Sequence, residues 1–142
     1  MAKFALAIGS QKSRLAVAVA AVPLLAPKMA LFKNDIVPTP SNVLADFTEA
    51  DFTGYAQQSP VFGAVVIDEN GIPVAPASST FTASGSAITN TVYGMYLLDS
   101  TGALVGAARF DSPRGFANLG DFEIVTLLFG LTDATISTAV GP

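Results

Sequence analysis

The sequence predicts an all-β fold, an antiparallel β-sandwich or barrel with an extended N-terminal arm and at most one short helix near residues 41–52. From position 61 onwards, turn residues recur at intervals of about ten residues. The segments between them are rich in β-branched and aromatic residues, which pack well on a pleated surface. Residues 91–110, TVYGMYLLDSTGALVGAARF, resemble two strands joined at Asp99–Gly102. A type I turn followed by a residue with positive φ favours glycine at that last position.

Composition divides the 142 residues into an arm (1–37), a motif segment (38–60) and a β domain (61–142). Hydrophobic residues make up 51% of the chain and charged residues only 13%, against a usual charged share of about 25%. Such a chain exposes more apolar surface than a monomer of this size normally does. We therefore expect part of this apolar surface to be buried against other copies of the chain or against partners. A homo-oligomer is expected, and a trimer is one option.

Charge is distributed unevenly along the chain. Residues 1–33 carry five basic residues and no acid, whereas residues 34–142 carry two basic residues and eleven acids. A basic arm on an acidic body predicts docking onto a neighbouring body. Nucleic-acid binding is not expected, because the basic residues are spread thinly among apolar ones.

Two missing residue types limit the chemistry. The chain has no His and no Cys, which removes the usual Ser-His-Asp and Cys-His nucleophile systems and the commonest zinc ligands. We therefore expect no enzymatic activity, no cofactor and no metal ion. The apolar run at residues 15–26 is too short to span a bilayer, so no membrane is expected as a partner either.

The arm alternates large apolar residues with alanines, a period of two that is typical of strands. A helix through residues 18–21 is one alternative, and a secretory leader, with Lys12 and Arg14 before the apolar run, is another. The strand-like arm is favoured, because exposed aliphatic side chains would forgo about 1.5–3 kcal/mol each. The residues expected to contact a neighbouring subunit are Phe4, Leu6, Ile8, Leu15, Val17, Val19, Val22, Leu24 and Leu25.

The motif segment contains a five-residue echo, ADFTE followed by ADFTG. A spacing of five places Phe47 and Phe52 on different faces of a helix or a strand, so we expect a turn between them. Thr48 followed by Asp51 is typical of a helix start. Upstream, Pro38 and Pro40 favour extended or turn geometry, and Thr39 is a possible N-cap.

Asp46, Glu49 and Asp51 form the carboxylate cluster of the sequence. Such oxygens suit a hard cation or a general-acid pair, but the spacing lacks the glycine and the length of a calcium loop. Solvated capping acids are the favoured interpretation.

The β domain is expected to begin with a strand, VFGAVVID at 61–68. Residues 72–77, which carry two prolines, suit an edge strand or a linker, and a further strand follows at 78–83. We expect a loop at 111–115, a closing strand at 121–131 and a last edge strand at 132–142. Arg109 and Arg114 flank that loop, where a structural salt bridge or a solvated rim is favoured over the binding of a free carboxylate. Gly94 and Gly106 predict close packing or curvature of the hairpin.

Two segments, PTPSNVLADFTEADFTGY (38–55) and TVYGMYLLDSTGALVGAARF (91–110), resemble small structural proteins encoded among the virion genes of tailed bacteriophages. The resemblance covers about half of the chain and does not include the arm before Leu31. It implies a virion component without catalysis.

This resemblance does not distinguish head from tail. Together with the low charge and the apolar arm, it leads us to expect a capsid decoration or minor capsid protein that stabilises the shell, with a major capsid or tail protein as partner. A phage tail component and a secreted or surface β-sandwich binding module with an uncleaved leader are the alternatives. Expected contacts of the body are Phe47, Phe52, Tyr55, Tyr93, Tyr96 and Phe110.

Overall fold

The computed structural model of the chain describes residues 2–3, 5–6, 26–64, 66–67, 69, 73–130 and 134–140. Nearly all regular structure in this part is β, which confirms the predicted class. The strands are β1 (Ala2–Lys3), β2 (Ala5–Leu6), β3 (Lys28–Phe32), β4 (Val61–Phe62), β5 (Val66–Ile67), β6 (Pro73–Thr82), β7 (Asn90–Leu98), β8 (Leu104–Phe116), β9 (Phe122–Gly130) and β10 (Ala134–Val140). One turn of 3₁₀ helix, η3, spans Leu44–Asp46.

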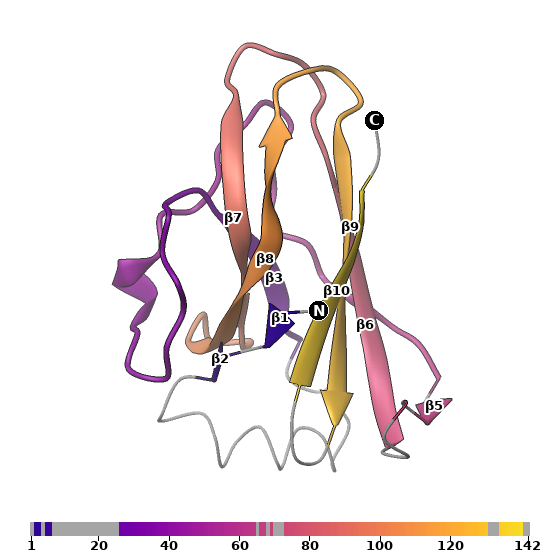
Figure 1. Cartoon of the computed structure of the whole chain (residues 1–142). Coiled ribbons are helices and arrows are strands. Elements are labelled where there is room, and N and C mark those ends of the chain that lie inside the picture. Colours follow the sequence, from indigo (N-terminus) through magenta and orange to yellow (C-terminus); the bar gives the residue numbers. More distant parts are fainter. Residues whose placement is uncertain are drawn as a thin grey trace.

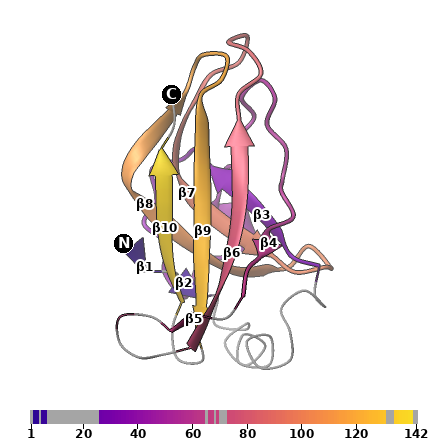
Figure 2. The same ribbon diagram turned by 90° about the vertical axis from the view of Figure 1, so that its right-hand side faces the viewer.

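The strands form two open antiparallel sheets packed face to face (Figures 1 and 2). Sheet A has the order β1-β10-β9-β6-β4, with β5 also paired to β6, and sheet B has the order β2-β8-β7-β3. The fold is therefore a sandwich and not a closed barrel. Lys28–Phe32, which the sequence analysis assigned to the arm, forms strand β3 of the body.

The central hairpin lies where the sequence predicts it, as β7 and β8 of sheet B. Its turn is held by Asp99, whose Oδ1 accepts hydrogen bonds from the Thr101 backbone N–H (2.8 Å) and hydroxyl (2.6 Å) and from Ala103 N–H (3.0 Å). Gly102 takes a φ of 84°, a conformation that costs glycine little because it has no Cβ.

Residues 111–115 are not the predicted loop but part of β8. Val92 pairs with Arg114 and Gly94 pairs with Arg109, so residues 110–113 stand opposite Tyr93 alone. The strand absorbs the extra residues as a bulge, the position within a sheet where Pro113 is tolerated.

The predicted break between residues 72–77 and 78–83 is also absent, because β6 runs without interruption between β9 and the short strands β4 and β5. The Pro76 carbonyl accepts a hydrogen bond from Gly63 N–H (2.8 Å) on the β4 side. In an antiparallel strand the N–H and C=O of one residue point to the same neighbour. The missing N–H of Pro76 therefore leaves the long β6–β9 ladder intact.

Sheet B is buried on both faces. Alternate residues of β3 and β7, such as Met29 and Met95, enter the core between the two sheets. Their neighbours along the strands, such as Phe32 and Tyr96, form a second core on the opposite face. Burial on both faces explains why residues 94–98 read as an uninterrupted apolar run instead of alternating with polar residues.

The second core is covered by residues 33–60, which we call the belt (Figure 1, left). The belt also borders the free edge of β3, through hydrogen bonds from Lys33 N–H to Thr48 O (2.8 Å) and from Ala50 N–H to Leu31 O (2.9 Å). Phe47 enters the second core and Phe52 the core between the sheets, so their predicted placement on different faces is confirmed.

The predicted helix start at Thr48 and the turn between the two phenylalanines are wrong. Glu49 instead forms a bridge with Phe32 of β3. An odd spacing along extended chain already sends side chains to opposite faces, so no turn is needed. The 3₁₀ helix lies further upstream, where Asp46 accepts a hydrogen bond from Val43 N–H (2.9 Å).

Candidate assembly surface

The first residues of the chain contribute a short strand to each sheet. Ala2 and Lys3 pair with β10 of sheet A, and Ala5 and Leu6 pair with β8 of sheet B. The predicted strand character of the arm is thus confirmed at Leu6, with its own chain as the pairing partner. The other arm residues, Phe4, Ile8, Leu15, Val17, Val19, Val22, Leu24 and Leu25, lie outside the described residues.

The six aromatic residues expected to contact a partner lie in the interior of their own chain or at its margin. Phe52 stacks on Phe116 with ring centroids 4.1 Å apart, and Phe47 packs 5.1 Å from Phe32. Phe110 and Tyr96 are buried as well, and Tyr55 and Tyr93 are half-buried. The surface available to a partner therefore lies largely elsewhere, and the contact of these residues with another molecule stays a prediction.

Glu49 joins the belt to the two cores. Its Oε1 accepts hydrogen bonds from the Tyr55 hydroxyl (2.8 Å) and from Gln57 Nε2 (3.0 Å). The Tyr55 hydroxyl in turn accepts one from Leu31 N–H (3.2 Å). Burial, together with the nearby Glu49 carboxylate, raises the pKa of Tyr55 and of Tyr96 above the ordinary range. Both phenols thus stay protonated, and the Tyr55 hydroxyl donates a hydrogen bond to the Glu49 carboxylate.

The other two carboxylates of the predicted cluster, Asp46 and Asp51, make separate contacts. Asp46 accepts hydrogen bonds from Asn42 Nδ2 and from Val43 N–H, which lower its pKa. Asp51 pairs with Lys33 Nζ at 2.7 Å and accepts a hydrogen bond from Asn90, and these contacts lower its pKa. Among the described residues no group of three or more carboxylates is placed to hold a metal ion. The capping interpretation therefore holds for Asp46, whereas Asp51 ties the belt to β7.

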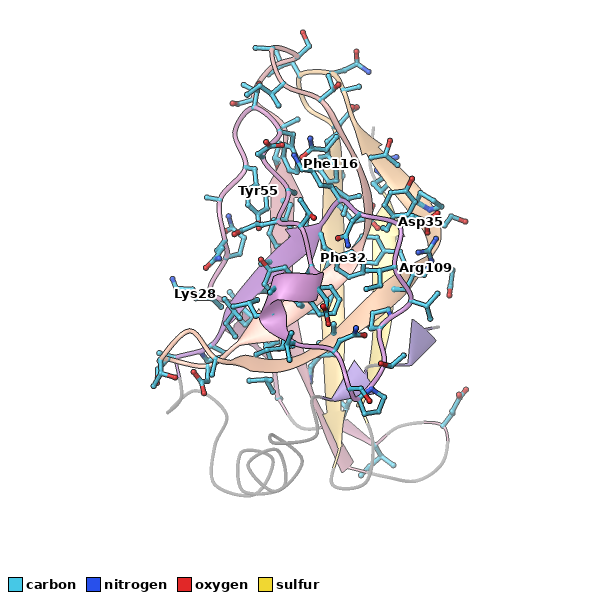
Figure 3. The ribbon with its side chains drawn as sticks, turned by 90° about the vertical axis from the view of Figure 1, so that its left-hand side faces the viewer. Lys28, Phe32, Asp35, Tyr55, Arg109 and Phe116 are labelled. Atoms are coloured by element: carbon cyan, nitrogen blue, oxygen red, sulfur yellow. The ribbon has the colours of Figure 1, made fainter. Side chains whose placement is uncertain are left out.

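Both arginines of the β domain form structural ion pairs, as the sequence analysis favoured. Arg109 lies beside Asp35 (2.6 Å), donates to Ile36 O (3.1 Å) and stands 5.1 Å over the Tyr93 ring, on the outer side of sheet B (Figure 3). Arg114 of sheet B reaches Glu123 of sheet A (Nε to Oε2, 3.3 Å), whose side chain is buried. Neither guanidinium is arranged to bind a free carboxylate.

Among the side chains that the structure describes, the exposed large aliphatic residues that lie in strands belong to residues 61–67, VFGAVVI, which we call the outer strand. It runs beside β6 as β4 and β5, with one extra residue between them, because β4 pairs with residues 77–78 and β5 with residues 73–74. Val61 is 74% exposed, Val66 48% and Ile67 65%. Within the part of the chain that the structure describes, no strand pairs with the far side of this segment.

Sequence reasoning placed a strand here but did not single it out as a site. The available signal was a run of seven uncharged residues, five of which have high β propensity, a combination that favours pairing with another chain. The other exposed aliphatic side chains that the structure describes belong to the belt (Val37, Val43, Leu44) or to loops (Ile88, Leu119).

Helices long and apolar enough to cross a membrane do not occur in the described part of the chain. Comparison of the chain with protein-family models, with curated proteins and with solved structures gave no match in any of the three.

Proposed function

We propose that this protein is a virion structural protein, a capsid decoration or minor capsid component that stabilises the shell by contacts with copies of itself and with a major capsid protein. The observation that carries the proposal is the outer strand, an uncharged and exposed edge of a sheet. Monomeric β proteins normally protect such edges with charges, prolines or a covering segment. A protein that works in a permanent assembly has that edge covered by a neighbour.

Two further observations support the proposal. The resemblance of residues 38–55 and 91–110 to phage virion proteins implies a structural component. In addition, the two arginines Arg109 and Arg114 and the three clustered carboxylates Asp46, Glu49 and Asp51 are engaged in contacts that hold the fold together. A structural component needs a rigid fold of this kind, because its surfaces must hold static contacts. The proposed role requires no catalytic group.

The test is quantitative mass spectrometry of purified particles from cells that produce this chain. Peptides of the chain should co-purify with the particle in a fixed ratio to the major capsid protein. Separated heads and tails then distinguish a capsid role from that of a tail component.

A second candidate function is a secreted or surface binding module, which the apolar run behind Lys12 and Arg14 favours. Absence of the chain from particles, together with its recovery outside the cells without the residues up to about position 26, would establish this alternative and overturn the virion proposal.

A further inference from the structure

The outer strand lacks the usual protection of an edge. Residues 61–67 contain no charge and no proline, and the three described large side chains, Val61, Val66 and Ile67, are exposed. The outer strand deviates from a regular strand between β4 and β5, where its register with β6 shifts by one residue. An unpaired edge of this composition binds another strand readily.

The first strands of the same chain are placed at the opposite side of sheet A. β1 pairs with β10, and three strands, β10, β9 and β6, separate β1 from β4. With about 4.8 Å between neighbouring strands, β1 and β4 are on the order of 19 Å apart. The segment that covers the outer strand therefore is not the N-terminal pair β1 and β2 of its own chain.

The chain contains one segment whose charge and apolar pattern complement the outer strand. Residues 12–19, KSRLAVAV, begin with two basic residues and continue with large aliphatic residues at every second position. The outer strand has the reverse order, because its aliphatic residues come first and the acids Asp68 and Glu69 follow. Glu69 is exposed.

We propose that the outer strand of one molecule pairs in antiparallel orientation with residues 12–19 of a second copy. This inference rests on the self-association in the proposed function and names the surface that receives the arm. Antiparallel alignment places Arg14 opposite Asp68 and Leu15 opposite Ile67, and it places Lys12 diagonally from Asp68 on the same face of the sheet. A parallel alignment would place the basic residues beside Val61 and lose both charge contacts.

The first experiment measures the oligomeric state of the full chain by sedimentation velocity. Val66→Lys places a cation beside the incoming basic segment and should weaken self-association by about tenfold or more, because like charges at an interface are costly. Thr80→Lys, at an exposed position on β6, is the matched control and should leave self-association unchanged. A monomeric wild-type protein, or equal association of both variants with wild type, would overturn the inference.

A charge exchange keeps the test valid if Val66→Lys unfolds the protein. Asp68→Lys with Glu69→Lys should weaken association, as should Lys12→Glu with Arg14→Glu, and the combination of all four changes should restore it. Failure of the combination to restore association would exclude this pairing.

Disulfide trapping distinguishes a second copy from the same chain, since the natural chain has no cysteine. An equimolar mixture of the single variants Leu15→Cys and Ile67→Cys should form a mixed dimer under mild oxidation. Absence of that dimer overturns the inference, as does an internal disulfide formed in the monomeric double variant. The outcome is independent of particle mass spectrometry, so pairing in solution without presence on particles would reject the virion role alone.

Discussion

At the scale of the residue, Gly94 shows how closely sheet B is packed. It lies in β7, where the register with β8 shifts. A Cβ atom at this position would overlap the Ala108 carbonyl oxygen and stand 2.5 Å from Cζ of Phe32. Of the two explanations considered for this strand glycine, close packing therefore holds, and the adjacent bulge adds curvature.

Gly94→Ala should lower the free energy of unfolding by about 2–3 kcal/mol, because overpacking a buried site forces backbone and ring to shift. Gly115→Ala is the control, since a Cβ there meets nothing within 4 Å, and its effect should stay within about 0.5 kcal/mol. Urea denaturation followed by circular dichroism measures both. Equal stability of the two variants would contradict the close approach.

At the scale of the element, the belt is held to sheet B mainly by Phe47, whose ring lies between Phe32 and Tyr96. Its side chain is only 7% exposed. Phe47→Ala should lower the free energy of unfolding by about 3 kcal/mol, the lower end of the range for a buried Phe→Ala change. Denaturant unfolding checks the cost, and limited proteolysis should then cleave within residues 33–60.

The matched control for the belt is Val43→Ala, because Val43 is 58% exposed. This change should leave stability within about 0.5 kcal/mol of wild type and the proteolysis pattern unaltered. A Phe47→Ala protein as resistant as the control would show that the belt is held by other contacts.

The turns of the β domain depend on ionised aspartates. Hydrogen bonds from Thr101 lower the pKa of Asp99, and those from Ala117 and Asn118 N–H lower the pKa of Asp121. A carboxyl group whose pKa is lower in the folded chain stabilises the fold above its ordinary pKa of about 3.9. That contribution is lost as the pH falls through the lower, folded value.

Thermal unfolding should therefore be nearly independent of pH from about 5 to 8, a range in which no histidine titrates, and the midpoint should fall below about pH 4. Asp99→Asn with Asp121→Asn should be less stable at pH 7 and show a shallower acid decline. Calorimetry between pH 2.5 and 7 measures the unfolding midpoint of both proteins. If the midpoint of the variant falls with acid as steeply as that of wild type, the two turns are not the source of the acid sensitivity.

At the scale of the whole molecule, the Arg114–Glu123 ion pair connects the two sheets. Glu123 is 2% exposed, and Arg114 also donates to Phe122 O (3.2 Å). Arg114→Met should lower stability by about 3 kcal/mol, because it leaves a carboxylate buried without its cation. Arg114→Met with Glu123→Leu should recover most of that loss, since an apolar pair of similar volume has no charge to desolvate. Chemical denaturation measures the stability of both variants. A loss of stability below about 1 kcal/mol for Arg114→Met alone would contradict a structural role for this ion pair.

The sequence predicts several elements correctly because their causes are local. The central hairpin follows from strand-forming residues on either side of Asp99 and Gly102, and the separation of Phe47 from Phe52 follows from an odd spacing. The strand at residues 122–130 and the final strand at 134–140 are likewise evident from composition, although the final strand is not the predicted edge, because β1 pairs with its other side. These features depend on interactions within a few residues, which a sequence displays directly.

Only the tertiary structure decides which segments meet. Residues 48–50 have a helix-start pattern but border β3, and Pro113 has a loop signature but lies in a bulge. The order of strands in each sheet determines the partners of Arg109 and Arg114. It also determines the exposure of Val61, Val66 and Ile67 at the rim of sheet A. The sequence alone determined the class of fold and the turn of the central hairpin. The strand order decided the rest, because pairing between distant strands satisfies backbone groups and buries side chains in ways that local preference cannot specify.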